Sequence, residues 1–166
     1  MKNVEHLKKA VRAFHSAEIR FVLIGGLAMI AHGANTAISR VVDVVYESDS
    51  DNIERLAAFL PTIHARVLGR PAHDGFTITA SMLRNVRFLN LYTDLGEVDV
   101  MREIPGVESF DGLYERSILS DFGGFTVRIA SLDDLISMKR AANRPKDQNH
   151  LYELLALKKL IEVESV

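Results

Sequence analysis

Two aspartates stand inside apolar runs of the sequence. Asp43 lies in "VVDVV" and Asp99 lies in "GEVDVM". Aspartate is depleted in β-strands and a buried carboxylate without a partner is unfavourable, so both positions need an explanation. Side chains alternate along a strand, so Asp43 points away from Val42 and Val44. If the two strands are neighbours, both carboxylates lie on one face and can bind a hard divalent cation such as Mg²⁺, which also takes substrate phosphates as ligands.

A second explanation of the two carboxylates needs no cation. Each aspartate would then lie at a sheet edge, where it caps a turn or pairs with a nearby arginine such as Arg40 or Arg102. The first explanation requires the two acids to lie side by side, and the second requires a separate partner for each.

A glycine pair follows the first apolar run, "RFVLI". A strand that ends at Gly25 and Gly26 and continues into a helix lets the backbone approach a phosphate closely and directs free N–H groups toward it. The pair is therefore a candidate phosphate-binding turn. Gly-Gly also occurs in many turns that bind no phosphate, so the pair alone is a weak signal.

A lysine lies on the apolar stripe of a helix near the C-terminus. Lys139 points with the leucines, so we expect it to reach a pocket that holds phosphate, joined by Arg144 and Lys146 from the next turn. The alternative is that Lys139 extends to solvent or pairs with Asp147 on the last helix. The stripe consists of Leu132, Leu135, Ile136 and Lys139.

The elements that position these residues alternate in type along the chain. They predict one mixed α/β (α+β) domain over residues 1–166, with a sheet of about five to six strands, helices packed on it and a helical C-terminal tail. Residues 61–76, with two prolines and two glycines, are expected to be an ordered loop without chemistry. The expected strands lie in 20–26, 40–47, a hairpin over 86–102 and a pair over 118–130; the expected helices lie in 4–17, 26–33, 48–60, 104–117, 132–142 and 146–162.

Composition removes several classes of function. The 166 residues carry a net charge of -2, so no overall basic field favours long nucleic acids. There are no cysteines, which excludes disulfides, thiolate metal sites and a cysteine nucleophile. No stretch has the character of a signal peptide or a membrane span, so a cytoplasmic location is expected. The six histidines show no metal-ligand spacing, and no serine-hydrolase motif is present.

The same residues carry a resemblance to a known family. "IGGLAMIAHG", "SRVVDVVY", "GEVDVM" and "SLDDLISMKRAANRPKD" resemble the nucleotidyltransferase superfamily, and most of all small bacterial nucleotidyltransferase-like proteins related to the abortive-infection (type IV toxin–antitoxin) toxin enzymes. The similarity covers roughly residues 5–157, and "MKRAANRPKD" is its most specific part. It implies a nucleotidyltransferase fold with a glycine turn, an Asp-x-Asp pair on the next strand and a third acid on a later strand.

The sequence departs from that pattern at its first acid. The resemblance assigns Asp43 to the second acid of the Asp-x-Asp pair and Asp99 to the third, and Val41 stands where the first acid is expected. Ala37 replaces the usual basic residue and Ser39 replaces the usual threonine. A valine supplies no oxygen ligand, so two acids remain where the pattern has three.

The resemblance implies two alternative functions. In the first, Mg²⁺ held by Asp43 and Asp99 serves the transfer of a nucleoside monophosphate from a triphosphate to a hydroxyl of RNA, such as tRNA, or of a protein. In the second, a degenerate relative binds a nucleotide, RNA or a partner protein without catalysis. A cognate antitoxin is a further implied partner. The residues assigned to the triphosphate are Gly25, Gly26, Ser39, Lys139, Arg144 and Lys146.

Overall fold

A single mixed sheet of seven strands forms the centre of the molecule. The structure is a computed structural model that describes residues 2–35 and 37–166. The strands follow the order β3-β4-β5-β2-β1-β7-β6, so β2 is the middle strand. The strands are β1 (Phe21–Ile24), β2 (Val41–Tyr46), β3 (Arg66–Val67), β4 (Phe88–Thr93), β5 (Gly96–Met101), β6 (Ile118–Asp121) and β7 (Thr126–Ile129).

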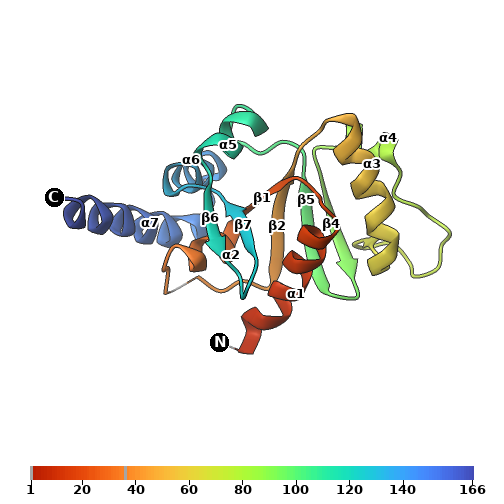
Figure 1. Ribbon diagram of the computed structural model, residues 1–166, viewed down its shortest axis with the longest axis horizontal. Coiled ribbons are helices and arrows are strands. Elements are labelled where there is room, and N and C mark those ends of the chain that lie inside the picture. Colours follow the sequence, from red (N-terminus) through yellow and green to blue (C-terminus); the bar gives the residue numbers. More distant parts are fainter. Residues whose placement is uncertain (1, 36) are drawn as a thin grey trace.

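Helices lie on both sides of this sheet. Figure 1 shows the last helix, α7, running away from the body of the molecule to the C-terminus. No helix in the described part of the chain is long and apolar enough to cross a membrane. The helices are α1 (Lys2–Ser16), α2 (Gly25–Ala31), α3 (Ser50–Phe59), α4 (Ala80–Asn85), α5 (Phe110–Arg116), α6 (Leu132–Ala142) and α7 (Pro145–Glu164), with a 3₁₀ turn η1 (Leu60–Ile63).

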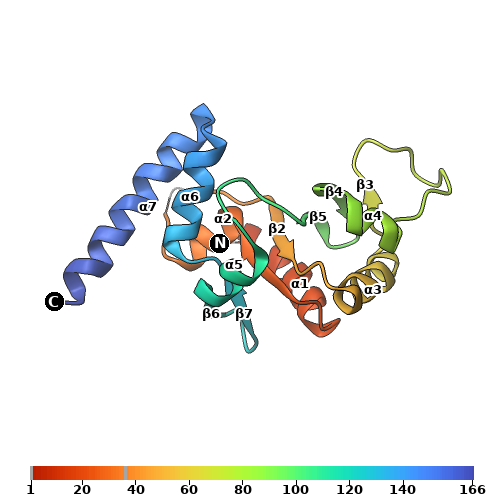
Figure 2. The ribbon, with the colours of Figure 1, turned by 90° about the horizontal axis from the view of Figure 1, so that it is seen from above.

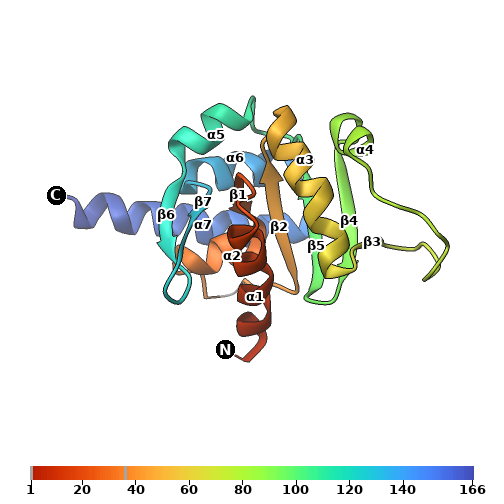
Figure 3. The ribbon, with the colours of Figure 1, turned by 45° about the vertical axis from the view of Figure 1, so that its right-hand side comes forward.

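The two faces of the sheet differ in what covers them. On β2, Val42, Val44 and Tyr46 are buried on the side of α1 and α3, whereas Val41 and Asp43 on the opposite side are only partly buried. Figures 2 and 3 show α1 and α3 on one side of the sheet and α6 and α7 on the other. The alternation expected of a strand therefore turns Asp43 toward the side of α6 and α7.

The expected architecture is confirmed, with one strand more than the five to six predicted. The additional strand, β3, lies in the stretch expected to be an irregular loop and pairs with β4 through Arg66 opposite Tyr92 and Val67 opposite Leu91. It was missed because two residues form no detectable period. The helix expected over 48–60 is capped by Asp49, which accepts a hydrogen bond from the Asn52 amide, whereas the helix expected over 104–117 begins only at Phe110.

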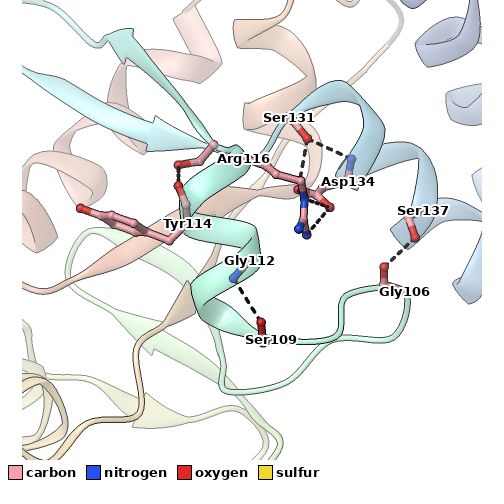
Figure 4. Close-up of polar contacts among 9 residues, drawn as sticks. Gly106, Ser109, Gly112, Tyr114, Arg116, Ser131, Asp134 and Ser137 are labelled. Carbon is pink, nitrogen blue, oxygen red and sulfur yellow. Dashed lines mark hydrogen bonds and ion pairs between the residues drawn. The ribbon is translucent and has the colours of Figure 1, made fainter.

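The segment between β5 and α6 is tied to α6 by side chains (Figure 4). The Arg116 guanidinium binds both oxygens of Asp134, with Nη2 2.9 Å from Oδ1 and Nε 3.0 Å from Oδ2. Ser131 caps α6 by accepting from the Asp134 amide, and the Ser137 hydroxyl donates to the Gly106 carbonyl at 2.6 Å. These contacts hold α6, which carries Lys139, against the segment that follows Asp99.

Gly106 provides a test of this attachment. It has a φ of +91°, and a Cβ at this position would lie 2.6 Å from the Ser137 carbonyl oxygen. We expect Gly106→Ala to lower the free energy of unfolding by about 2–4 kcal/mol, since it adds a backbone clash to the strain of a left-handed conformation. Urea unfolding followed by circular dichroism measures the loss.

Gly123 is the matched control for this substitution. Its φ of +89° is nearly the same, but a Cβ there would meet nothing within 4 Å. Gly123→Ala should therefore cost only the backbone strain, about 1–2 kcal/mol. Equal losses in the two variants would show that the contact between Gly106 and α6 contributes nothing to stability.

Candidate functional site

Asp43 and Asp99 lie side by side at the middle of the sheet. The strands β2 and β5 pair in parallel, and the register sets Asp43 directly opposite Asp99. Residues opposite each other in a sheet project to the same face. The row continues to Asn90 on β4 and to Ile24 on β1. Both aspartates therefore point to the side of α6 and α7 from interior strands.

The proximity of the two carboxylates changes the acidity of one of them. Burial raises the pKa of Asp43 above its ordinary value, and the charge and hydrogen bonding of Asp99 raise it further. The charges of Lys139 and Arg144 act in the opposite direction. Two ionised carboxylates in this arrangement repel each other, so a cation bound between them would lower the free-energy cost of keeping both ionised.

The glycine turn at the end of β1 lies against this pair. Gly25 has a φ of +69°, and a Cβ at Gly25 would overlap the Asp43 carboxylate. A Cβ at Gly26 would lie 3.2 Å from Cβ of Ser39. The absence of both side chains thus lets the first turn of α2 approach β2 closely, and it leaves the Asp43 oxygens beside a bare backbone.

Ser39 has a local role in this turn. Its side chain is buried and its hydroxyl donates a hydrogen bond to the Val41 carbonyl at 2.9 Å. The hydroxyl proton is therefore in use within the chain, and the oxygen keeps acceptor capacity only. Its contribution to a nucleotide site stays a prediction.

The basic residues gather around one buried carboxylate at the junction of α6 and α7. Asp147 is 1% exposed; its Oδ1 lies 3.1 Å from Nζ of Lys139 and its Oδ2 lies 2.7 Å from Nε of Arg144. Burial by itself would raise the pKa of Asp147, but hydrogen bonds from Arg144 and Lys139 hold it well below its usual range. Lys146 lies in the same turn and is exposed.

The ion pair expected in one of the two alternatives for Lys139 is present, and the contact of Lys139 with phosphate stays a prediction. The ion pair with Asp147 is the alternative considered from the sequence, and the same lysine acts electrostatically on Asp43. Two cations share one anion, so the cluster keeps a net positive charge on the side of the sheet that carries the two aspartates. Lys139 and Arg144 are thereby placed near the acid pair.

The explanation that assigned an arginine partner to each aspartate fails. Arg102 binds the Val86 carbonyl and Glu103 instead, and within the described ranges Arg40 forms no ion pair. Asp43 and Asp99 also lie on interior strands and not at an edge of the sheet.

Two further polar residues share the face of the acid pair. Asn90 lies opposite Asp99, and Glu97 lies two residues before it on β5. Glu97 was visible in the sequence as the i, i+2 partner of Asp99 within "GEVDVM", but its relation to β2 depends on a strand pairing that the sequence does not specify. Phe88 and Tyr92 on β4, at 58% and 41% exposed, flank Asn90 on the same face.

The acid pair fits a cation that shares its ligands with a substrate. Asp43 and Asp99 supply hard oxygen ligands, and the lack of a side chain at Gly25 lets the Asp43 carboxylate lie against the backbone of the glycine turn. No three His, Cys, Asp or Glu side chains of residues 2–35 and 37–166 come close enough to hold a metal ion by themselves. Phosphate oxygens would have to complete the shell, which is the usual arrangement for Mg²⁺.

The buried carboxylate at the basic junction makes a prediction about pH. Because the pKa of Asp147 is lower in the folded protein than in the unfolded chain, its contribution to stability is present above about pH 4 and is lost as the pH falls through the folded pKa. Asp147→Asn should lower the free energy of unfolding by about 3 kcal/mol at pH 7. Urea unfolding at pH 7, 4 and 3 should show the difference from the native protein shrinking with acidity.

Asp133 supplies the control for that experiment. It pairs with Lys158 at 2.6 Å on the surface, and both side chains are exposed. Asp133→Asn should leave stability near that of the native protein across the same pH range, since exposed ion pairs contribute little. A difference for Asp147→Asn that did not change with pH would contradict the assignment of the lowered pKa.

Comparison with known proteins identifies the fold. No protein-family model matches the chain, and no curated protein matches it in sequence. Among solved structures, ANT(2")-Ia in complex with adenylyl-2"-tobramycin aligns with a TM-score of 0.59 at 14% identity, covering 99% of this chain and 92% of that one. The lincosamide antibiotic adenylyltransferase LnuA, bound to lincomycin, gives a TM-score of 0.61 at 12% identity, covering 92% and 96%.

A third solved structure has the same arrangement. An antigenic nucleotidyltransferase-like protein from Paracoccidioides brasiliensis aligns with a TM-score of 0.55 at 17% identity, covering 95% of this chain and 78% of that one. These similarities extend over nearly the whole of the present chain, and all three proteins are named for nucleotidyl transfer. The chain therefore has the nucleotidyltransferase fold.

Proposed function

We propose that this protein transfers a nucleoside monophosphate from a nucleoside triphosphate to a hydroxyl group. The oxygen of the acceptor hydroxyl attacks the α-phosphorus, a new O–P bond forms, and the bond from that phosphorus to the bridging oxygen breaks. Pyrophosphate leaves with the bond electrons, and the hydroxyl proton passes to solvent. The register that sets Asp43 opposite Asp99 beside Gly25 is the observation that carries the proposal.

Asp43 and Asp99 are the residues assigned to hold Mg²⁺ in this proposal. Their carboxylates are hard ligands on one face, and their mutual repulsion favours a cation. When bound, the ion supplies Lewis-acid polarisation of the phosphate and neutralises negative charge. The contribution of the chain is to keep the two carboxylates at fixed positions on interior strands, where they need no reorganisation.

The triphosphate is assigned to the side of the acid pair that carries the basic junction. Lys139 and Arg144 are held by Asp147 and keep a net positive charge toward Asp43, and exposed Lys146 adds to it. The backbone of Gly25 and Gly26 allows a close approach on the β1 side. In this arrangement Asp147 positions the two cations and does not itself contact the nucleotide.

The acceptor is assigned to the other side of the acid pair, over β4 and β5. This face carries Asn90 next to Asp99, with exposed rings at Phe88 and Tyr92. The resemblance in sequence points to a hydroxyl of RNA or protein, whereas two solved structures are named for tobramycin and lincomycin. A cognate antitoxin remains a prediction from the resemblance alone.

A second candidate function follows from Val41. It lies on the same face as Asp43, where it supplies no oxygen, and among the residues that the structure describes the acid pair has no third His, Cys, Asp or Glu placed to hold a metal ion. A protein of this kind would bind nucleotide or RNA, or a partner protein, without transferring the nucleotide.

A transfer assay separates the two functions. The native protein is incubated with labelled nucleoside triphosphates and Mg²⁺ together with bulk tRNA, cell extract, tobramycin or lincomycin. We expect transfer of label to one of these acceptors, and at least a 100-fold loss in Asp99→Ala because the carboxylate is needed for charge neutralisation.

Two variants make the assay decisive. Asp94→Asn changes an exposed acid in the turn of the same hairpin and should transfer label at the native rate. Val41→Asp introduces the acid that the sequence pattern lacks. Label transfer by Val41→Asp but not by the native protein would rule out the transferase and favour the binding protein.

A further inference from the structure

One buried nitrogen near the junction of α6 and α7 has no hydrogen-bond partner. Nδ1 of His150 is the only buried side-chain nitrogen or oxygen of residues 2–35 and 37–166 that lacks one. The residue as a whole is partly buried. A buried polar atom without a partner lowers stability, and folded proteins keep few of them. The position of His150 therefore calls for an explanation by function.

His150 lies beside the residues assigned to the triphosphate. It follows Asp147 by one turn of α7 and precedes Leu154 by one turn, and both of these neighbours are buried. This face of α7 packs against α6, which runs beside it (Figure 2). The charges of Lys139 on α6 and of Asp147 both act on the His150 ring. The imidazole thus belongs to the same cluster as the basic residues.

The next turn of α7 contacts the segment between α2 and β2. Oε1 of Glu153 accepts a hydrogen bond from the Asn35 amide at 2.6 Å. That segment joins the helix that starts at the glycine turn to the strand that carries Asp43. Along α7, His150 lies between the ion pairs of Asp147 and this contact. It therefore lies between the basic cluster and the segment that leads from the glycine turn to β2.

The carboxylates nearest to His150 along α7 are already engaged. Oδ1 of Asp147 lies 3.1 Å from Nζ of Lys139, and Oδ2 lies 2.7 Å from Nε of Arg144. Glu153 holds the backbone of the segment before β2. Neither acid forms a hydrogen bond with His150 within the described ranges. A partner for its nitrogen must therefore come from outside the chain.

The charge state of His150 defines the kind of partner. Burial lowers the pKa of the imidazole below its ordinary value, and the charges of Lys139 and Lys146 lower it further. The charges of Asp147 and Glu153 act in the opposite direction. At pH 7 the ring is neutral, and one of its nitrogens carries a hydrogen that it can donate. A donor beside cations suits the oxygen of an anion.

We propose that Nδ1 of His150 donates a hydrogen bond to a phosphate oxygen of the bound nucleoside triphosphate. This inference rests on the triphosphate site proposed above. Lys139 and Arg144 attract the phosphates by their charge, whereas the imidazole adds one directional bond from a fixed position on α7. The same bond gives the buried nitrogen the partner that the chain does not supply. His150 is thus a further binding residue of the site.

Binding of inorganic tripolyphosphate tests this contact without depending on activity or on the identity of the base. Isothermal titration calorimetry with Mg²⁺ present compares the native protein with His150→Leu and His150→Asn. Leucine removes the nitrogen, whereas asparagine carries an amide nitrogen on Cγ, as histidine carries Nδ1. We expect His150→Leu to bind about 10-fold more weakly and His150→Asn to stay within about 3-fold of the native affinity.

Stability separates a binding role from a structural one. His150→Leu removes a buried nitrogen that has no partner, so its Tm should equal or exceed that of the native protein while its affinity falls. A lowered Tm together with weaker binding would show that His150 supports the fold instead. His15→Leu, which removes an exposed imidazole from α1 on the other side of the sheet, should bind tripolyphosphate as the native protein does.

The histidine ring signals provide a second measurement on the native protein. Long-range ¹H–¹⁵N spectra resolve the ring nitrogens of the six histidines, and the signals missing from His150→Asn identify His150. We expect saturating tripolyphosphate to shift the Nδ1 signal of His150 and to leave that of exposed His15 in place. An unchanged Nδ1 signal at saturation would overturn the proposed bond.

The outcomes distinguish this inference from the proposal on which it rests. Native affinity in His150→Leu together with weak binding in Lys139→Gln would overturn the role of His150 and leave the triphosphate site in place. Native affinity in both variants, or no binding by the native protein, would overturn the triphosphate site and, with it, the role of His150. Equal weakening in His150→Leu and His150→Asn would contradict the assignment of the bond to Nδ1.

Discussion

The parallel pairing of β2 with β5 is the constraint on which the site depends. It places Asp43 beside Asp99. The valines on either side of each aspartate in its strand project to the opposite face and are buried. A slip of one residue would turn Asp99 into the core and expose Val98 and Val100. The burial of the valines therefore fixes the register, and the same register brings the two carboxylates together. Stability of the core and the geometry of the site have a common cause.

A buried carboxylate on α7 positions the basic residues of this region. Asp147 is buried at the junction of α6 and α7 and holds Lys139 and Arg144 in fixed positions. The contacts of Arg116 and Gly106 attach α6 to the chain that leaves β5. Within residues 2–35 and 37–166 no direct ion pair joins Asp43 or Asp99 to Lys139 or Arg144, so the fold itself holds these acidic and basic residues near one another. A ligand that combines negative charge with a bound cation would suit this arrangement, because the cation would interact with the two aspartates and the negative charge with Lys139 and Arg144.

The sequence was sufficient for much of the fold. The buried strands and the hairpin around Gly96 follow from local patterns, and the structure contains them. The short strand β3 has too few residues to produce a pattern. The order of the strands in the sheet is set by contacts between distant segments, which periodicity within one strand does not encode.

The candidate site shows the same division between local and distant information. The types of Asp43 and Asp99 were conspicuous because acids are rare between valines, whereas Glu97 at the end of a hairpin turn was not. Only the pairing of β5 with β2 gives Glu97 a relation to Val41. For Lys139, the apolar stripe of α6 indicated an inward direction but not the partner, and the structure supplies Asp147 as that partner.

The most direct test of the account is the position of a cation in a crystal of the native protein. Crystals grown with Mn²⁺ and a non-hydrolysable nucleoside triphosphate analogue would be measured at a wavelength where manganese scatters anomalously. The account predicts an anomalous peak between the carboxylates of Asp43 and Asp99, in contact with phosphate oxygens. A bound triphosphate whose manganese lies away from both aspartates would contradict it.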